Sequence, residues 1–128
     1  MVSEAVTDQI RVRVKSFYVP HRSQPEKHHF FYAYRIRITN EGSKAAKLIS
    51  RHWMITDGHG KLEEVRGSGV VGDQPRLEPG ESYEYTSACP LPTQYGEMHG
   101  TYHMVDDDGR RFQVRISPFK LFIPALAN

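Results

Sequence analysis

Apolar and polar residues alternate along short segments of the chain, and this alternation restricts the fold more than any other feature of the sequence. In residues 10–18, Ile10, Val12 and Val14 would lie on one face, with basic residues between them on the other. A period of two residues is that of a half-buried β-strand, whereas a helix repeats every three to four residues. No segment has a helical period. The predicted strands are 10–18, 30–39, 47–56, 61–66, 81–88, 98–105 and 111–116.

Turn-forming residues such as Asp57-Gly58 separate these segments, and their spacing predicts one compact sheet protein. Seven or more short strands are typical of an all-β, single-domain antiparallel β-sandwich of the immunoglobulin or fibronectin type III-like class. The 128-residue chain fits one domain, residues 1–128. We expect a flexible N-terminus at 1–9. The apolar C-terminal tail at 117–128 either packs as a last strand or is exposed to a partner, and packing is the favoured interpretation.

The composition narrows the classes of function. A hydrophobic fraction of 38% and a charged fraction of 25% are typical of soluble globular domains. Cys89 is the only cysteine, so an intramolecular disulfide is excluded and a reducing compartment is expected. The acidic start of the chain does not resemble a signal peptide, and no apolar run reaches the roughly 18 residues of a membrane span. We therefore expect a cytoplasmic protein with no membrane partner.

A net charge of +2 is too small, and the basic residues too dispersed, to predict nucleic-acid binding. The bases that do gather lie on predicted strands 10–18 and 30–39. If those strands are neighbours, their charges form a patch that either binds an acidic partner or is neutralised by acids such as Glu84, and the second interpretation is favoured. The basic residues of this patch are Arg11, Arg13, Lys15, Arg35 and Arg37.

A glycine motif, G-x-G-x-x-G, follows the predicted strand 61–66. In nucleotide-binding folds such a loop brings backbone amides to a pyrophosphate and leads into a helix. Here Pro75 prevents a helix, so a loop between strands that uses positive φ angles is the favoured interpretation. The alternative is an anion-binding nest of amides completed by nearby arginines. Its candidate residues for phosphate, pyrophosphate or a nucleotide are Gly67, Ser68, Gly69, Gly72, Arg66 and Arg76.

No set of residues has the spacing of a catalytic or metal site. On a strand, His99 and His103 would lie about 13 Å apart, too far to chelate one ion as a pair. Asp106 to Gly109 has the composition of a hairpin turn and lacks the glutamate of a calcium loop. Cys89 has no local base and is expected as a buried apolar residue. We therefore predict no catalytic residues, no metal and no cofactor.

Residues 51–86 join a tryptophan-bearing strand (R-H-W-M-I-T-D-G), the glycine motif and a Pro-Gly turn before Y-E-Y; 96–104 read G-E-M-H-G-T-Y-H-M. In this order and over nearly the whole chain, the sequence resembles the ApaG family. The resemblance implies a fibronectin type III-like fold without enzymatic activity. It also implies a genetic context of diadenosine tetraphosphate hydrolysis and of cobalt and magnesium handling. The resemblance to ApaG-like domains of larger eukaryotic proteins further implies an accessory interaction role.

Two functions follow as hypotheses. The first is a non-enzymatic module that binds an unidentified protein through loops 20–28 and 67–80 or through the tail. Exposed edge strands could also pair two copies, so a homodimer is one form of this hypothesis. The alternative is a small-anion binding protein that uses the Gly67 to Gly72 loop.

Overall fold

The structure of the chain, a computed structural model, describes residues 1–124 and consists of strands joined by turns. Two short 3-10 turns, Pro20–Arg22 and Pro25–Lys27, interrupt the connection between the second and third strands. The strands are β1 (Val2–Thr7), β2 (Ile10–Tyr18), β3 (Phe30–Asn40), β4 (Ala46–Asp57), β5 (Leu62–Ser68), β6 (Arg76–Leu77), β7 (Ser82–Leu91), β8 (Tyr95–Asp106) and β9 (Arg111–Phe122).

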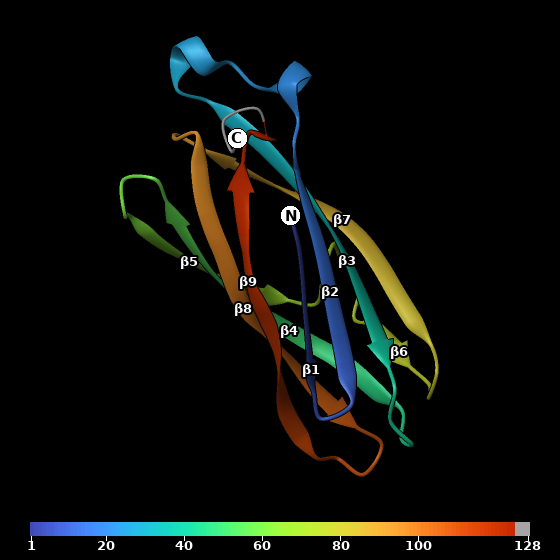
Figure 1. The fold of residues 1–128 in the computed structure, drawn as a ribbon. Helices are drawn as coiled ribbons and strands as arrows, with labels where there is room; N and C mark the ends of the chain where they lie inside the picture. Colours follow the sequence, from blue (N-terminus) through green and yellow to red (C-terminus); the bar gives the residue numbers. More distant parts are fainter. Residues whose placement is uncertain (125–128) are drawn as a thin grey trace.

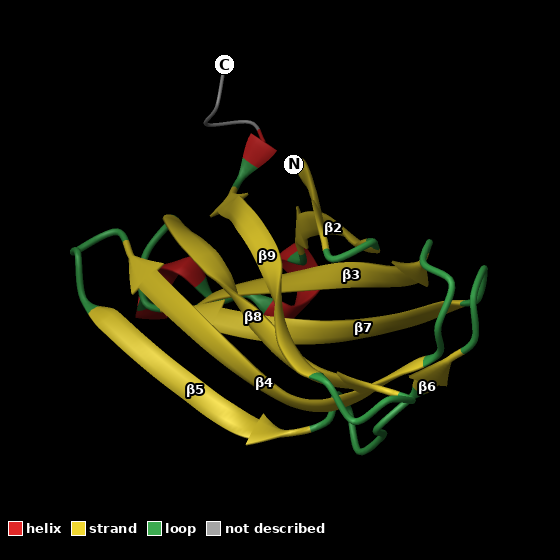
Figure 2. Cartoon of the chain, turned by 90° about the horizontal axis from the view of Figure 1, so that it is seen from below, coloured by secondary structure: helices red, strands yellow, loops and turns green. Residues whose placement is uncertain are grey.

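The strands form two antiparallel sheets packed face to face (Figures 1 and 2). One sheet has the order β1-β2-β3-β7, and the other has the order β5-β4-β8-β9 with the short β6 paired to β4. The predicted all-β, antiparallel sandwich is therefore confirmed. The predicted pairing of β2 with β3 is also confirmed, with Arg13 opposite Arg37 and Lys15 opposite Arg35.

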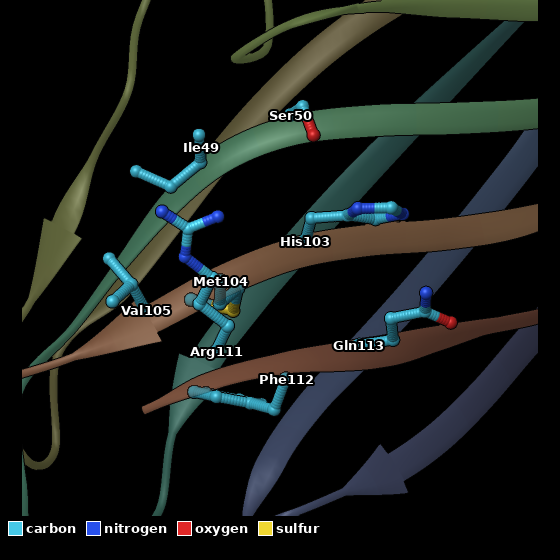
Figure 3. Close-up of a pocket in the computed structure, with 8 residues that line it drawn as sticks. All are labelled: Ile49, Ser50, His103, Met104, Val105, Arg111, Phe112 and Gln113. Carbon is cyan, nitrogen blue, oxygen red and sulfur yellow. The ribbon is translucent and has the colours of Figure 1, made fainter. Parts of the chain in front are cut away.

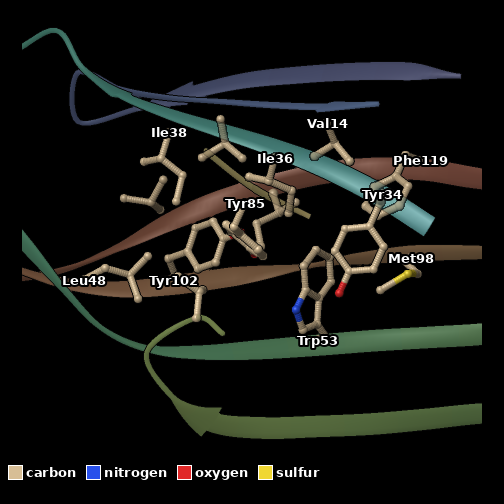
Figure 4. Packing of buried hydrophobic residues seen from close by; sticks show 14 of the residues in the cluster. Val14, Tyr34, Ile36, Ile38, Leu48, Trp53, Tyr85, Met98, Tyr102 and Phe119 are labelled. Atoms are coloured by element: carbon tan, nitrogen blue, oxygen red, sulfur yellow. The ribbon is translucent and has the colours of Figure 1, made fainter. Parts of the chain in front are cut away.

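The core lies between the sheets and is rich in aromatic side chains (Figure 4). Trp53 of β4 meets Phe119 of β9 edge-to-face, with ring centroids 5.9 Å apart. Tyr34 reaches the same tryptophan from the opposite sheet, at 5.5 Å. Edge-to-face pairs bring the positive ring edge onto the negative ring face, so they add a directional term to apolar burial. These rings fix the two sheets relative to each other.

A β-bulge in β4 changes which residues face the core. Strict alternation in the sequence places Ile49 on the same side as Trp53 and Ile55. The pairing of β4 with β8 instead shifts register between Leu48 and Ser50. Leu48 is consequently fully buried, whereas Ile49 is 37% exposed. The expected inward position of Ile49 is wrong because an extra residue in one strand reverses the alternation on one side of it.

The N-terminus departs from the flexible segment expected at residues 1–9. Residues 2–7 form β1 and pair with β2 along their whole length. The hydroxyl of Ser3 donates to the carbonyl of Ser117 at 3.2 Å, and Thr7 Oγ1 accepts from the amide of Arg115 at 3.1 Å. Both bonds lead to β9, so the flexible-terminus expectation is wrong and β1 belongs to the sandwich.

The C-terminal tail packs as predicted over the part that the structure describes. β9 continues to Phe122, and Phe119 and Leu121 are fully buried. The final residues of the expected tail, 125–128, lie outside the described residues.

The sandwich has two long sides that differ. On the closed seam, defined by β1 and β9, the end strands of the two sheets are joined by the hydrogen bonds of Ser3 and Thr7 (Figure 1). On the open seam, defined by β5 and β7, the loop 69–75 lies beside the two sheets and inserts the fully buried Val70. The edge of β7 carries Pro90, and β5 is mostly exposed and carries Glu63, Glu64 and Arg66, two features that disfavour edge-to-edge pairing.

Candidate functional site

The glycine motif builds a tight loop at the open seam. Gly69 and Gly72 have φ angles of +58° and +85°, which confirms the interstrand-loop interpretation at these two positions. Gly67 differs, because it lies in β5 directly opposite Arg51 of β4. A Cβ atom at Gly67 would lie 2.7 Å from Arg51 Nη1. The first glycine of the motif therefore makes room for an arginine side chain.

Several backbone amides of this loop are already engaged within the protein. The amide of Gly69 donates to the carbonyl of Ile49 at 2.8 Å. The amides of Val70 and Asp73 each donate to the carbonyl of the other residue. The Asp73 carboxylate also lies in the loop and accepts a hydrogen bond from the Tyr83 hydroxyl. These contacts form a closed turn with an acidic side chain, an arrangement unlike an open nest of amides facing an anion.

The two arginines of the predicted anion site pair with carboxylates. Arg66, on β5, lies 3.5 Å from Glu64. Arg76, on β6, bonds to Glu78 and, at 2.7 Å, to Asp107. Within the described residues, the basic side chain that hydrogen-bonds the loop is Arg51. Its Nη1 donates to the carbonyls of Ser68 and Gly69 at 3.0 and 2.9 Å. Two of the six predicted residues, Arg66 and Arg76, thus already have carboxylate partners within the protein.

Two of the five bases of the predicted patch have acidic partners, as the favoured interpretation predicted, whereas Arg13, Lys15 and Arg35 form no ion pair within 4.0 Å among residues 1–124. Arg37 lies 3.9 Å from Glu84 on β7, the countercharge named from the sequence. Arg11 pairs with Glu4 and, at 2.8 Å, with Glu41. The guanidinium of Arg11 lowers the pKa of the Glu41 carboxyl by direct hydrogen bonding.

The remaining chemically active side chains are dispersed. His52 Nε2 lies 3.1 Å from the Glu64 carboxylate, and His52 and Arg66 together lower the pKa of Glu64. Cys89 is buried as expected, and burial raises the pKa of its thiol to about 12. The Asp106 carboxylate caps its own hairpin by accepting from the amides of Asp108 and Arg110, which confirms the predicted turn. Among residues 1–124, no three metal-ligating side chains are grouped where they could hold an ion.

A concave surface lies where three connections meet at one end of the sandwich. This loop-end depression has a volume of about 550 Å³, and Tyr95 at its rim is 60% exposed. The 20–28 loop was predicted as a binding segment, whereas the 92–95 contribution was missed. Its lining residues are Pro25, His28, Phe30, Gly58, His59, Pro92, Thr93, Gln94 and Tyr95.

Hydrogen bonds hold these connections in place. Thr93 Oγ1 accepts from the Gly58 amide at 2.8 Å and donates to the Tyr95 carbonyl at 2.7 Å. The buried Tyr32 donates its hydroxyl to the Gln94 carbonyl. In the 20–28 connection, the Ser23 hydroxyl accepts from the Phe31 amide at 2.9 Å. A pre-ordered surface loses little conformational freedom when a partner binds.

A second depression, of about 460 Å³, lies across β4, β8 and β9 on the five-stranded sheet (Figure 3). The bulge contributes to it, because it turns Ile49 and Ser50 toward this surface beside His103. Arg111 and Gln113 of β9 complete the polar part of its wall. His103 and His99 lie on β8 at the separation expected for one strand, and the described residues supply no further ligand group around them.

Fold and surface together define a class: a two-layer antiparallel β-sandwich whose connections form a pre-ordered concave end. The family model described as "ApaG domain" matches residues 20–106. The Protein ApaG of Anaeromyxobacter dehalogenans (strain 2CP-C) is 51% identical over 127 residues, which cover 99% of this chain and all of that protein. The chain therefore belongs to the ApaG family.

Solved structures agree with this assignment. The crystal structure of the putative ApaA protein from Bordetella pertussis is 54% identical, with a TM-score of 0.88 over 90% of this chain and 94% of that chain. The C-terminal domain of wzt, at 8% identity and a TM-score of 0.52, covers 95% of this chain and 77% of that chain and shares the fold alone. No helix among the described residues is long and apolar enough to span a membrane.

Proposed function

We propose that the protein is a non-enzymatic, cytoplasmic interaction module that binds a protein partner at the loop-end depression. The observation that carries the proposal is the exposed ring of Tyr95, set in a concave surface with Pro25, Phe30 and Pro92. Tyrosine combines a large apolar face with a polar hydroxyl and is enriched at the centres of protein interfaces.

The rigidity of this surface supports the same function. The Tyr95 hydroxyl donates to the Gly58 carbonyl at 3.2 Å, so the ring is tied to the β4–β5 turn. A fixed aromatic side chain pays less side-chain entropy on binding than a mobile one. The surface is thus suited to receive a partner without rearrangement.

The test is affinity capture from cell extract with the wild-type protein and two variants, quantified by mass spectrometry. Tyr95→Ser removes the exposed ring. Val6→Ser removes an exposed apolar side chain from β1, outside the depression, and serves as the matched control. We expect specific partners to be captured by the wild type and by Val6→Ser and to be lost with Tyr95→Ser. Retention by Tyr95→Ser would contradict the proposal.

The absence of enzymatic activity is checked separately. We expect the purified protein to leave diadenosine tetraphosphate intact. His52 pairs with Glu64, and His103 lines the depression on the five-stranded sheet. Turnover that disappears in His52→Ala or His103→Ala would overturn the non-enzymatic proposal.

The small-anion alternative has weaker support, because the amides of Gly69 and Val70 and the two arginines have protein partners. An amide-resolved NMR titration with pyrophosphate checks it. Saturable shifts at Gly67, Gly69 and Gly72 that persist at moderate salt would favour anion binding over the interaction module.

A further inference from the structure

The open seam contains a cleft that none of the proposed functions uses. This seam cleft has a volume of about 240 Å³ and enters between the two sheets. Its walls come from both sheets and from the glycine loop. The lining is mixed: apolar side chains such as Trp53, Val65 and Val70 lie beside polar groups that include the phenols of Tyr34 and Tyr85 and the Ser87 hydroxyl. Figure 4 shows Tyr34, Trp53 and Met98, three of its lining residues, together between the sheets.

One charged side chain, Arg51, lines this cleft. It lies two residues before Trp53 on β4, beyond the bulge, and therefore on the same inward face. The residue is only partly exposed, unlike Arg66 on the neighbouring strand. A guanidinium in such a place is costly unless its donors are satisfied.

The protein satisfies only part of the Arg51 guanidinium. Nη1 donates to the carbonyls of Ser68 and Gly69, which holds the group over Gly67. Among residues 1–124, Arg51 forms no ion pair within 4.0 Å, whereas Arg66, on the neighbouring strand, lies 3.5 Å from Glu64. Its remaining nitrogens, Nε and Nη2, provide the two-donor edge that suits a carboxylate.

The electrostatic environment also differs between the Arg51 end and the Cys89 end of the cleft. Burial raises the pKa of Tyr34 and Tyr85, and the positive charge of Arg51 acts against this rise at both phenols. At Cys89, burial raises the pKa and the charge of Glu63 adds to the rise. An acidic group is therefore favoured at the Arg51 end of the cleft and disfavoured at the Cys89 end.

We propose that the seam cleft binds a small monocarboxylate with an apolar, preferably aromatic, body. The carboxylate pairs with Arg51, and the body lies against Trp53 and Val65. The volume equals that of about eight water molecules at roughly 30 Å³ each, which limits the ligand to roughly ten non-hydrogen atoms. A phosphate dianion fits less well, since a single guanidinium offsets only one of its two negative charges.

The glycine motif acquires a role in this arrangement. Gly67 leaves space for Arg51, and the loop that follows places Val70 in the cleft wall. Val71 beside it has a φ angle of +42°, a conformation that strains a β-branched residue. Strain of this kind persists where neighbouring contacts over-determine the backbone.

The experiment follows the fluorescence of Trp53, the only tryptophan, during titration with phenylacetate and with its neutral isostere phenylacetamide. The proposal gives an expected dissociation constant for phenylacetate in about the millimolar range. Phenylacetamide should bind about tenfold or more weakly, since a charge-assisted pair is lost. Sodium chloride at matched ionic strength controls for salt.

Three variants assign the site. Arg51→Gln should remove the preference for phenylacetate over phenylacetamide. Arg66→Gln, which loses the same charge from an exposed position on β5, should keep it. Val65→Phe fills the cleft from its half-buried edge and should weaken both ligands about tenfold or more. Thermal unfolding of each variant verifies that it is folded. If Arg51→Gln is unstable, the binding of the two ligands to Val65→Phe decides whether they bind in the seam cleft.

The opposite results overturn the proposal. For the wild type, these are equal binding of the two ligands, or no saturable change in fluorescence with phenylacetate up to tens of millimolar, well above the expected dissociation constant. For the variants, they are a preference for phenylacetate that persists in Arg51→Gln, or binding that is unchanged in Val65→Phe.

Discussion

The closed seam and the open seam are made from the same kind of strand, yet they differ in how the two sheets meet. At the closed seam, the carbonyls of β9 accept hydrogen bonds from the hydroxyls of Ser3 and Ser16, and a β9 amide donates to Thr7 Oγ1. Four apolar side chains of β9 are fully buried: Val114, Ile116, Phe119 and Leu121. At the open seam, a glycine loop and an arginine take the place of direct strand contacts. One side of the sandwich contributes stability, and the other retains space.

The difference teaches that a sandwich need not be uniform to be stable. Full burial of apolar side chains on one side supplies the free energy of folding. The other side can then accommodate half-buried groups such as Arg51 and Val65 and a strained residue such as Val71. Functional surfaces in proteins are commonly placed where local stability is lower.

The largest effect should concern the thiol of Cys89 at the open seam. A pKa raised to about 12 leaves a thiolate fraction near 10⁻⁴ at pH 8, so we expect alkylation by iodoacetamide about a thousandfold slower than for an unperturbed thiol. The rate should rise about tenfold per pH unit until unfolding or the pKa is reached. Mass spectrometry follows the reaction, and the protein in urea is the control. Rapid alkylation of the folded protein would show that the open seam admits solvent to its interior.

A matched pair of valines measures the two seams directly. Val114→Ala on β9 removes a fully buried side chain and should cost about 2–4 kcal/mol of the free energy of unfolding. Val65→Ala on β5 removes a half-buried one and should cost about 1 kcal/mol. Urea denaturation gives both values. Equal costs would remove the distinction between the seams.

A smaller effect is expected from the polar links of the closed seam. Ser16 is 6% exposed, and its hydroxyl donates to the Lys120 carbonyl at 2.7 Å. Ser16→Ala should lower the free energy of unfolding by about 1–2 kcal/mol, because a partly buried carbonyl loses its donor. Ser68→Ala, at an exposed site on the open seam, is the control and should stay within about 0.5 kcal/mol.

The smallest effect is a gain in stability. Val71→Asn places a residue that tolerates a positive φ at a strained and 56% exposed position of the open seam. We expect thermal unfolding to report a stabilisation of about 0.5–1 kcal/mol, with no gain for Val6→Asn on β1. A loss of stability at Val71→Asn would mean that the Val71 side chain contributes packing that outweighs its strain.

Alternation was sufficient to predict most of the sandwich. β2 and β3 begin at the predicted residues, because each carries an unbroken apolar face. The alternation failed at Ile49, since a bulge is a property of the pairing between two strands and leaves no local mark on one of them. It also failed at β1, where the inward positions Ser3, Ala5 and Thr7 are small or polar and give no hydrophobic period.

The candidate sites were less predictable for a related reason. The glycine motif suggested a ligand loop, but the meaning of Gly67 depends on Arg51 in the neighbouring strand. The spacing of Arg51 from Trp53 does indicate that the arginine lies on the same face as the tryptophan, because residues two apart share a face of a strand. The loop-end depression joins segments around residues 25, 58 and 95, which only the tertiary fold brings together.

The closed seam also sets the order in which a growing chain can complete its fold. β1 emerges first from the ribosome, but the bond between Ser3 and Ser117 joins residues 114 positions apart. Until β9 has been synthesised, the β1–β2 hairpin can pair only within its own sheet, and its inward face lacks the strand β9 that covers it. Such distant pairings slow folding and prolong the exposure of apolar surface. β9 is therefore the strand that completes the burial of the β1–β2 hairpin.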